Sequence, residues 1–176
     1  MEEKSYKEYL EHITTFVFDV DGVLTDGNII VTTDGEMLRS MNIKDGYALK
    51  TAVDAGYNVC IISGGSNEGV RKRLRGLGVT DIYLGCSDKV ERLDEYFDIY
   101  KIDAKNVLYM GDDIPDIYGM KMVGLPCCPN DAVAEIKNIS KYVSHKNGGK
   151  GCVRDVIEQV LKVQGKWNGS YDAKYD

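Results

Sequence analysis

Two groups of aspartates have the residue types and the placement for metal and phosphate chemistry. Asp19 and Asp21 follow an apolar run near the N-terminus, and Asp112, Asp113 and Asp116 follow a second run, NVLYMG. Carboxylates brought this close together would repel one another strongly unless a cation lay among them. Oxygen ligands of this kind suit Mg²⁺, which keeps several of its waters and often bridges carboxylates to a substrate phosphate. The aspartates therefore predict both a Mg²⁺ ion and a phosphorylated ligand.

A phosphate bound near these carboxylates needs hydrogen-bond donors and positive charge. Ser63 follows the apolar run YNVCII, and the backbone N–H groups of Gly64 and Gly65 come directly after it. Lys89 follows the run DIYLG, at the start of a segment with helical spacing. Alone, each of these is more typical of an ordinary turn or a solvated helix residue, and the aspartates from Asp112 onward also fit a solvated helix N-cap. Their shared position, after successive apolar runs, favours a phosphate site.

The elements that must position these residues are short apolar runs rich in β-branched residues. The runs are ITTFVFDV, YNVCIISGG, DIYLG, NVLYMGDD, VGLPCC and KYVS. Between them lie segments with helical spacing, such as SNEGVRKRLRGLG and DKVERLDEYFDIY. Strand alternating with helix predicts an α/β fold with a doubly wound parallel sheet, whose ligands bind at the carboxyl ends of the strands.

The chain is predicted to form one domain over residues 1–163, followed by a polar tail over residues 164–176. Residues 27–42, GNIIVTTDGEMLRSMN, interrupt the alternation with two strand-like arms around Asp34-Gly35, which predicts a β-hairpin inserted after the first strand. Near the C-terminus, apolar residues at helical spacing predict a helix packed on the core. They are Val153, Val156, Ile157, Val160 and Leu161.

Composition excludes several classes of function. The formal charge of -6 disfavours a nucleic-acid or anionic-membrane partner. The charged N-terminus lacks the apolar part of a signal peptide, and no stretch is long and apolar enough to cross a bilayer, so we expect a cytoplasmic protein. Five cysteines without a CxxC pair indicate reduced thiols, and two distant histidines make a zinc site improbable.

Taken together, FDVDGVLTD, IISGG, Lys89 and GDDIPD resemble the four signature motifs of the haloacid dehalogenase-like (HAD) phosphatases. The resemblance runs from about Thr14 through Arg154 and implies a Rossmann-like fold. It implies that Asp19 is the nucleophile, which forms an aspartyl-phosphate. It further implies that Asp21 is the general acid to the leaving alcohol and then the base to the hydrolytic water.

The same resemblance implies roles for the remaining motif residues. Ser63 and Lys89 would contact the phosphate. Mg²⁺ would be held by Asp19, the backbone carbonyl of Asp21, and Asp112. Two further acids, Asp113 and Asp116, would support this site.

The intervals between the motifs are too short for the cap domain that most members of this superfamily carry. The first interval holds only the hairpin and one helix, and the second only one helix and one strand. The chain is thus similar to the small capless (C0) subclass, whose members are tetramers. This resemblance implies a homotetramer in which a neighbour's hairpin covers each open site.

Within that subclass, four segments are similar to the phosphatases of 3-deoxy-D-manno-octulosonate 8-phosphate (KDO 8-phosphate), in lipopolysaccharide sugar synthesis. The segments are MNIKDGYALK, the helix around residues 70–73, GDDIPD and GGKGCVRDVIEQVL. By position, the resemblance implies a set of contacts to the sugar acid or its phosphate. The set is Asn42, Ile43, Lys44, Asp45, Gly46, Lys50, Gly64, Arg73 and Lys150. Relatives often carry Arg where this chain has Gly65 and Lys150, and Lys lacks the bidentate geometry of Arg.

Several alternatives stay open from sequence alone. Solvated helix residues are the alternative interpretation of Lys50 and Arg73, and the glycines around Lys150 fit either a flap over the substrate or a plain loop. The nearest rival substrate is 2-keto-3-deoxy-nononate 9-phosphate, although the Gly64-Gly65 pair favours the eight-carbon acid. A phospho-receiver domain would need a carboxylate where CIISGG has none. A catalytically inert homologue is disfavoured because all four motifs are intact.

Overall fold

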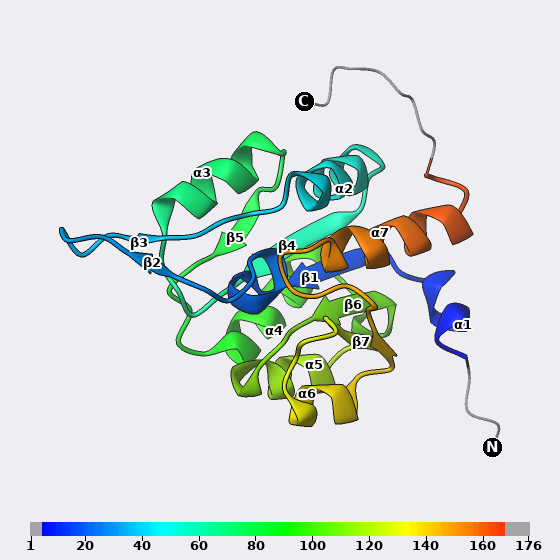
Figure 1. The fold of residues 1–176 in the computed structure, drawn as a ribbon. Helices are drawn as coiled ribbons and strands as arrows, with labels where there is room; N and C mark the ends of the chain where they lie inside the picture. Colours follow the sequence, from blue (N-terminus) through cyan, green and yellow to red (C-terminus); the bar gives the residue numbers. More distant parts are fainter. Residues whose placement is uncertain (1–4, 168–176) are drawn as a thin grey trace.

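The computed structural model describes residues 5–167, which form a parallel sheet covered by helices on both faces (Figure 1). Six strands pair in the order β5-β4-β1-β6-β7-β8. They are β1 (Thr15–Phe18), β4 (Asn58–Ile62), β5 (Asp81–Tyr83), β6 (Val107–Met110), β7 (Leu125–Cys128) and β8 (Tyr142–Val143). Each strand lies within one of the apolar runs, so the predicted doubly wound α/β fold is confirmed.

The helices divide between the two faces of this sheet. One face is covered by α2 (Ile43–Asp54), α3 (Glu68–Gly76) and α7 (Cys152–Val163), with α1 (Tyr6–Leu10) beside α7. The other face is covered by α4 (Lys89–Tyr100), α5 (Ile117–Lys121) and α6 (Ala134–Ile139). Three single turns, η1 (Val20–Leu24), η2 (Ala104–Asn106) and η3 (Ile114–Asp116), complete the connections.

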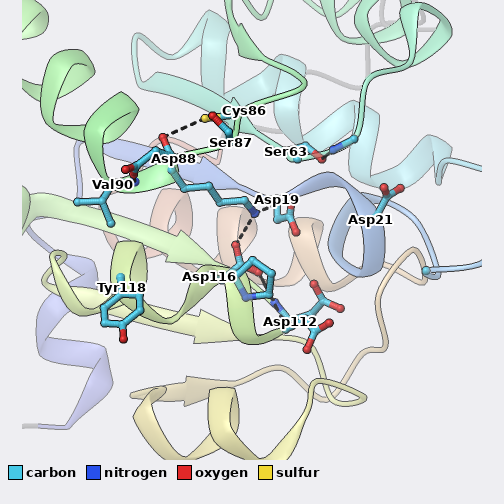
Figure 2. A pocket seen from close by; sticks show the side chains of 16 residues that line it. Asp19, Asp21, Ser63, Cys86, Ser87, Asp88, Val90, Asp112, Asp116 and Tyr118 are labelled. Atoms are coloured by element: carbon cyan, nitrogen blue, oxygen red, sulfur yellow. Dashed lines mark hydrogen bonds and ion pairs between the residues drawn. The ribbon is translucent and has the colours of Figure 1, made fainter.

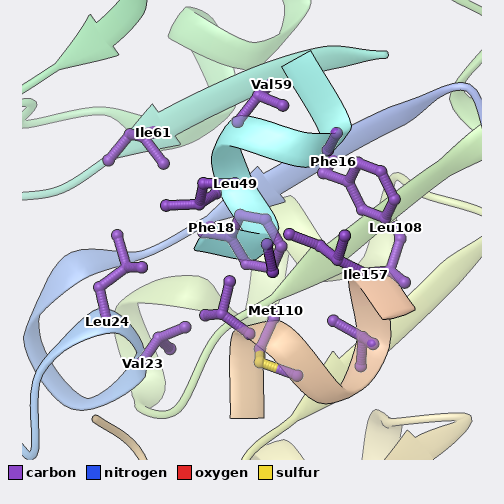
Figure 3. Close-up of a cluster of buried hydrophobic side chains, with 14 of the residues drawn as sticks. Phe16, Phe18, Val23, Leu24, Leu49, Val59, Ile61, Leu108, Met110 and Ile157 are labelled. Carbon is purple, nitrogen blue, oxygen red and sulfur yellow. The ribbon is translucent and has the colours of Figure 1, made fainter. Parts of the chain in front are cut away.

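Successive side chains of the central strands enter two separate hydrophobic cores. Phe16 and Phe18 pack in the core under α2 and α7, together with Leu49 and Ile157 (Figure 3), whereas Val17 packs in the core under α4. This period of two is what a strand imposes on side chains, and it explains why the runs are apolar throughout rather than alternating. Burial on both faces fixes the register of the strands, and with it the position of the polar residues at their ends.

A two-stranded hairpin follows β1, as predicted. Its arms are β2 (Ile30–Val31) and β3 (Met37–Leu38), which pair antiparallel, and Gly35 has a φ of +82° in the turn between them. In Figure 1 the hairpin extends away from the sheet. In the described residues, the chain between β1 and β4 holds only η1, this hairpin and α2, and that between β4 and β5 holds α3. The expected absence of a cap between the motifs thus agrees with the fold.

The C-terminal helix packs as predicted, and the chain stays packed beyond it. All five residues of the apolar stripe on α7 are buried. Gln164 donates hydrogen bonds to the carbonyls of Leu10 and Ile13 at 2.8 Å, and Trp167 packs against the core. Residues 164–167 of the predicted polar tail therefore belong to the packed domain, and residues 168–176 lie outside the described part. Within the described residues, no helix is long and apolar enough to span a membrane.

Candidate active site

The polar ends of three neighbouring strands line one cavity of about 580 Å³ (Figure 2). Asp19 follows β1, Ser63 follows β4 and Asp112 follows β6; β1 lies between the other two strands in the sheet. Asp21 and Lys89 also line this cavity. The structure thus brings together the residues that the sequence placed at successive strand ends, as expected for an open α/β sheet.

Asp19 is a buried carboxylate held in a fixed orientation. Its side chain accepts a hydrogen bond from the N–H of Val20 at 2.7 Å and lies 3.2 Å from Nζ of Lys89, and the residue is only 7% exposed. Burial and then the charge of Asp116 raise the pKa of Asp19 to about 7, although Lys89 and the Val20 N–H act in the opposite direction. The residue therefore needs further positive charge nearby to be fully ionised at neutral pH.

Lys89 is delivered to the cavity by the first turn of α4. The carboxylate of Asp88 caps this helix by accepting the N–H groups of Val90 and Glu91 at 2.9 and 3.0 Å. Nζ of Lys89 lies 2.7 Å from Oδ1 of Asp116. Burial alone would lower the pKa of Lys89, but the carboxylates of Asp19 and Asp116 outweigh burial and raise it. The ammonium group therefore stays charged next to Asp19.

Asp116 uses both of its oxygens on protein groups. Oδ1 accepts from Lys89 and from the hydroxyl of Tyr109 at 2.8 Å, and Oδ2 accepts the N–H of Asp112 at 3.1 Å. Asp113 caps η3 by accepting the N–H of Ile114 at 2.8 Å. Both acids thus shape the loop after β6. Tyr109 was not predicted as a site residue, because nothing in its apolar run distinguishes it from an ordinary core tyrosine.

Asp112 has a carboxylate oxygen that is available to bind a cation. Its Oδ1 is buried and has no hydrogen-bond partner among the described residues. Burial, and then the charges of Asp19 and Asp116, raise the pKa of Asp112 to about 7. Carboxylate oxygens of Asp19, Asp112 and Asp116 lie within 4.8 Å of one another. A buried, unpartnered oxygen beside other carboxylates fits a divalent cation with oxygen ligands.

The second motif contributes Ser63 and the glycines after it. Ser63 is buried, and its Oγ accepts the N–H of Gly65 at 3.2 Å. Gly64 lines the cavity, as do Asp88 and Tyr118, neither of which was predicted as a site residue. The hydroxyl and the exposed glycine backbone are placed at the cavity wall where a phosphate could meet them.

Most of the residues expected to contact the substrate lie outside this cavity. Asn42 caps α2 by accepting the N–H groups of Lys44 and Asp45, and its Nδ2 donates to the carbonyl of Gly149 at 3.2 Å. Ile43 and Lys44 are exposed on the surface. Of the nine residues in the expected set, Gly64 is the one that lines the main cavity.

Asp45 joins two helices instead of facing a cavity. It is 1% exposed, and its Oδ1 accepts the N–H of Arg154 in the first turn of α7 at 2.8 Å. Its Oδ2 is buried without a partner in the described residues, and burial raises the pKa of Asp45 to about 6. Gly46 packs beside the guanidinium of Arg73. This part of the expected substrate segment therefore holds α2 against its neighbours within the chain.

All four cations of the expected set also lie outside the main cavity. Lys50 lies 3.3 Å from Asp54 on α2, and Arg73 is exposed on α3. Lys150 and Lys44 line a second cavity of about 500 Å³ beside α7. Within a single chain, these side chains do not reach the main cavity, so a role in substrate binding stays a prediction.

Comparison with known proteins agrees with the motifs and the fold. A family model described as haloacid dehalogenase-like hydrolase matches residues 79–157. The 3-deoxy-D-manno-octulosonate 8-phosphate phosphatase KdsC of Salmonella typhi is 37% identical over 156 residues, which cover 89% of this chain and 83% of the relative. The chain belongs to the 3-deoxy-D-manno-octulosonate 8-phosphate phosphatase (KdsC) family of HAD-like hydrolases.

Solved structures of family members share the fold closely. The Yersinia pestis 3-deoxy-D-manno-octulosonate 8-phosphate phosphatase is 32% identical, with a TM-score of 0.91 over 94% of this chain and 90% of that one. The Moraxella catarrhalis phosphatase is 31% identical, with a TM-score of 0.88 over 92% of this chain and 93% of the other. The latter structure is a complex with a magnesium ion, a phosphate ion and KDO.

Proposed function

We propose that this chain is a Mg²⁺-dependent phosphatase that hydrolyses KDO 8-phosphate to the free sugar acid and phosphate, as in lipopolysaccharide sugar synthesis. The observation that carries the proposal is the buried carboxylate of Asp19, 3.2 Å from Nζ of Lys89, in a cavity that also contains the unpartnered Oδ1 of Asp112. The magnesium, phosphate and KDO bound by the Moraxella catarrhalis relative support the choice of metal and substrate.

The proposed reaction uses covalent catalysis by Asp19. A carboxylate oxygen of Asp19 attacks phosphorus, while Asp21 gives a proton to the leaving alcohol oxygen; Asp21 then takes a proton from the water that hydrolyses the aspartyl-phosphate. Lys89 and Ser63 stabilise charge on the transferring phosphoryl group. Mg²⁺, when held by Asp19, Asp112 and the backbone carbonyl of Asp21, supplies positive charge that offsets repulsion between nucleophile and phosphate.

The substrate is tested by a panel of sugar phosphates assayed with Mg²⁺. We expect kcat/KM for KDO 8-phosphate to exceed that for 2-keto-3-deoxy-nononate 9-phosphate and for common sugar phosphates. Equal values for the eight- and nine-carbon acids would contradict the assignment. An inert homologue, the alternative from a different class, would turn over none of them. The receiver alternative loses support because the relatives over most of the chain are phosphatases.

We further propose that the hairpin contacts another copy of the chain in a homotetramer. Its support is the run of exposed apolar side chains on β2 and β3, among them Ile30, Val31, Met37 and Leu38. A neighbouring copy would also be the means by which residues such as Lys44 and Lys150 approach a substrate, since they lie away from the cavity of their own chain.

Light scattering of hairpin variants tests this assembly. Val31→Lys places a charge on an apolar residue that is 68% exposed, and we expect it to yield smaller species and lower activity. Ile99→Lys on α4, at 69% exposure, is the matched control and should leave the assembly unchanged. A fully active monomeric wild type would rule the assembly out.

The free thiols fit a reducing cytoplasm, which we propose as the location of the protein. Cys60, Cys127, Cys128 and Cys152 are buried and unpaired, and Cys86 is partly buried.

A further inference from the structure

We propose that Arg39, at the end of the hairpin, is a positioning residue that holds the carboxylate of Asp21 at the wall of the active-site cavity. This proposal rests on the proposed function, because Asp21 is the general acid and base of that reaction. Arg39 was not singled out by any motif, and it lies 18 residues from Asp21 in the sequence. The hairpin would thereby act on the catalytic machinery of its own chain.

The contact between the two side chains is bidentate. Nε of Arg39 donates to Oδ1 of Asp21 at 2.6 Å, and Nη2 donates to Oδ2 at 3.1 Å. Paired donors of this kind fix the plane of a carboxylate as well as its position. The side chain of Arg39 is 7% exposed and that of Asp21 is 34% exposed, so the arginine lies behind a carboxylate that faces solvent.

The hairpin end that carries Arg39 is itself tied to the second motif. Nη1 of Arg39 donates to the carbonyl of Met37 at 3.2 Å, and Nδ2 of Asn67 donates to the same carbonyl at 3.0 Å. Asn67 caps α3, which begins directly after the Ser63 loop, by accepting the N–H of Val70 at 3.0 Å. These bonds hold the guanidinium between the hairpin and the loop that carries Ser63 and Gly65.

Gly65 provides the room for this pair. A Cβ at Gly65 would lie 2.9 Å from Oδ2 of Asp21 and 3.2 Å from Nη2 of Arg39, so any side chain there would push the carboxylate and the guanidinium. The absence of a side chain at Gly65 therefore leaves the space in which Asp21 and Arg39 meet.

Arg39 acts through Asp21 and not on the substrate. It does not line the main cavity, whereas Asp21 does, and its bonded nitrogens serve Asp21 and Met37. Without the guanidinium, the Asp21 side chain would lose the two hydrogen bonds that fix its orientation at the cavity wall. Small misplacements of a catalytic group lower turnover about 10- to 100-fold.

A double-mutant cycle on kcat tests the proposal, with Mg²⁺ and KDO 8-phosphate, whose leaving alcohol needs a proton, as the substrate. We expect Arg39→Ala to lower kcat about 10- to 100-fold and to change KM less than about threefold, because a positioning residue affects the proton-transfer group more than binding. Asp21→Asn should lower kcat further. The double variant should be no slower than Asp21→Asn, since Arg39 has no other route to the reaction.

Rescue separates positioning from a general loss of structure. Added guanidinium should restore part of the kcat of Arg39→Ala but not that of Asp21→Asn, and Arg39→Lys should retain intermediate activity.

Gly65→Ala should lower kcat in the wild type and have a smaller effect in the Arg39→Ala background, where the arginine side chain no longer occupies the space. Arg71→Ala is the control, because Arg71 binds Glu68 at 3.1 Å on α3 without lining the main cavity. It should leave kcat unchanged.

Three outcomes in an active enzyme would overturn the proposal. Losses that multiply in the double variant would show that Arg39 acts independently of Asp21, an effect confined to KM would make it a binding residue, and a raised kcat would make the pair inhibitory. An inactive wild type would overturn this proposal and the proposed function together, whereas losses in kcat that multiply in an active enzyme would overturn this one alone.

Discussion

The groups around Asp19, the proposed nucleophile, determine how readily its carboxylate ionises. Asp19 is buried between a lysine and two further acids, and the pKa of both Asp19 and Asp112 is raised to about 7. Lys89 offsets part of this negative charge from one side, and Asp116 fixes Lys89 in place. Protons and a bound cation would therefore compete for these carboxylates near neutral pH, as expected of a metal-dependent phosphate site.

Removing the ammonium group of Lys89 tests this balance at the scale of one residue. Lys89→Met leaves Asp19 and Asp116 without their cation, so we expect kcat/KM to fall by about 100-fold or more and the free energy of unfolding to fall by about 3 kcal/mol at neutral pH. Lys72→Met on the exposed part of α3 is the control. Steady-state assays and urea unfolding measure both effects; unchanged kcat/KM would contradict the role of Lys89.

Among the elements, α2 and α7 are joined by a buried acid whose ionisation is unfavourable. Burial raises the pKa of Asp45 to about 6 from an ordinary value of 3.8. The folded state thus binds this proton more tightly than the unfolded state does. The associated stability is fully present below pH 3.8 and is lost as the pH rises through about 6.

Asp45→Asn removes this titration and makes the difference in stability depend on pH. We expect the variant to gain up to about 3 kcal/mol relative to the wild type between pH 4 and pH 7. Urea unfolding across this range measures the difference. Asp94→Asn, at an exposed position on α4, should show no such trend. A constant difference between wild type and Asp45→Asn would show that the carboxylate does not titrate in this window.

Among the secondary-structure elements, the strands and the hairpin could be predicted from sequence because they depend on local periodicity. The β-branched runs and the Asp34-Gly35 turn are local signals, and the strand ends then place Asp19, Ser63 and Asp112 together. Arg39, Tyr109 and the internal role of Asp45 could not be predicted in this way. Each depends on groups that meet only after packing, such as the carboxylate of Asp45 and the N–H of Arg154, which are 109 positions apart in the sequence.

For the molecule as a whole, the proposed metal site would link Mg²⁺ binding to the free energy of unfolding. A cation that binds the folded state alone stabilises it by about 2.7 kcal/mol at 100 times its dissociation constant. We expect Mg²⁺ to raise Tm, and to do so more at pH 8 than at pH 6, because Asp19 and Asp112 must lose their protons to bind it.

Thermal unfolding with and without Mg²⁺ measures this linkage. Asp112→Asn should remove most of the increase in Tm, whereas Asp94→Asn should keep it. An equal increase in the Asp112→Asn variant would place the cation elsewhere.

The central claim is that Asp19 carries the phosphoryl group, and acid quenching during turnover tests it most directly. The wild-type protein, mixed with KDO 8-phosphate and Mg²⁺ and quenched within a turnover, should show a phosphorylated peptide that contains Asp19 by mass spectrometry. Asp19→Asn should show neither this adduct nor turnover. Full activity in Asp19→Asn, or a phosphoryl group on another residue, would contradict the account.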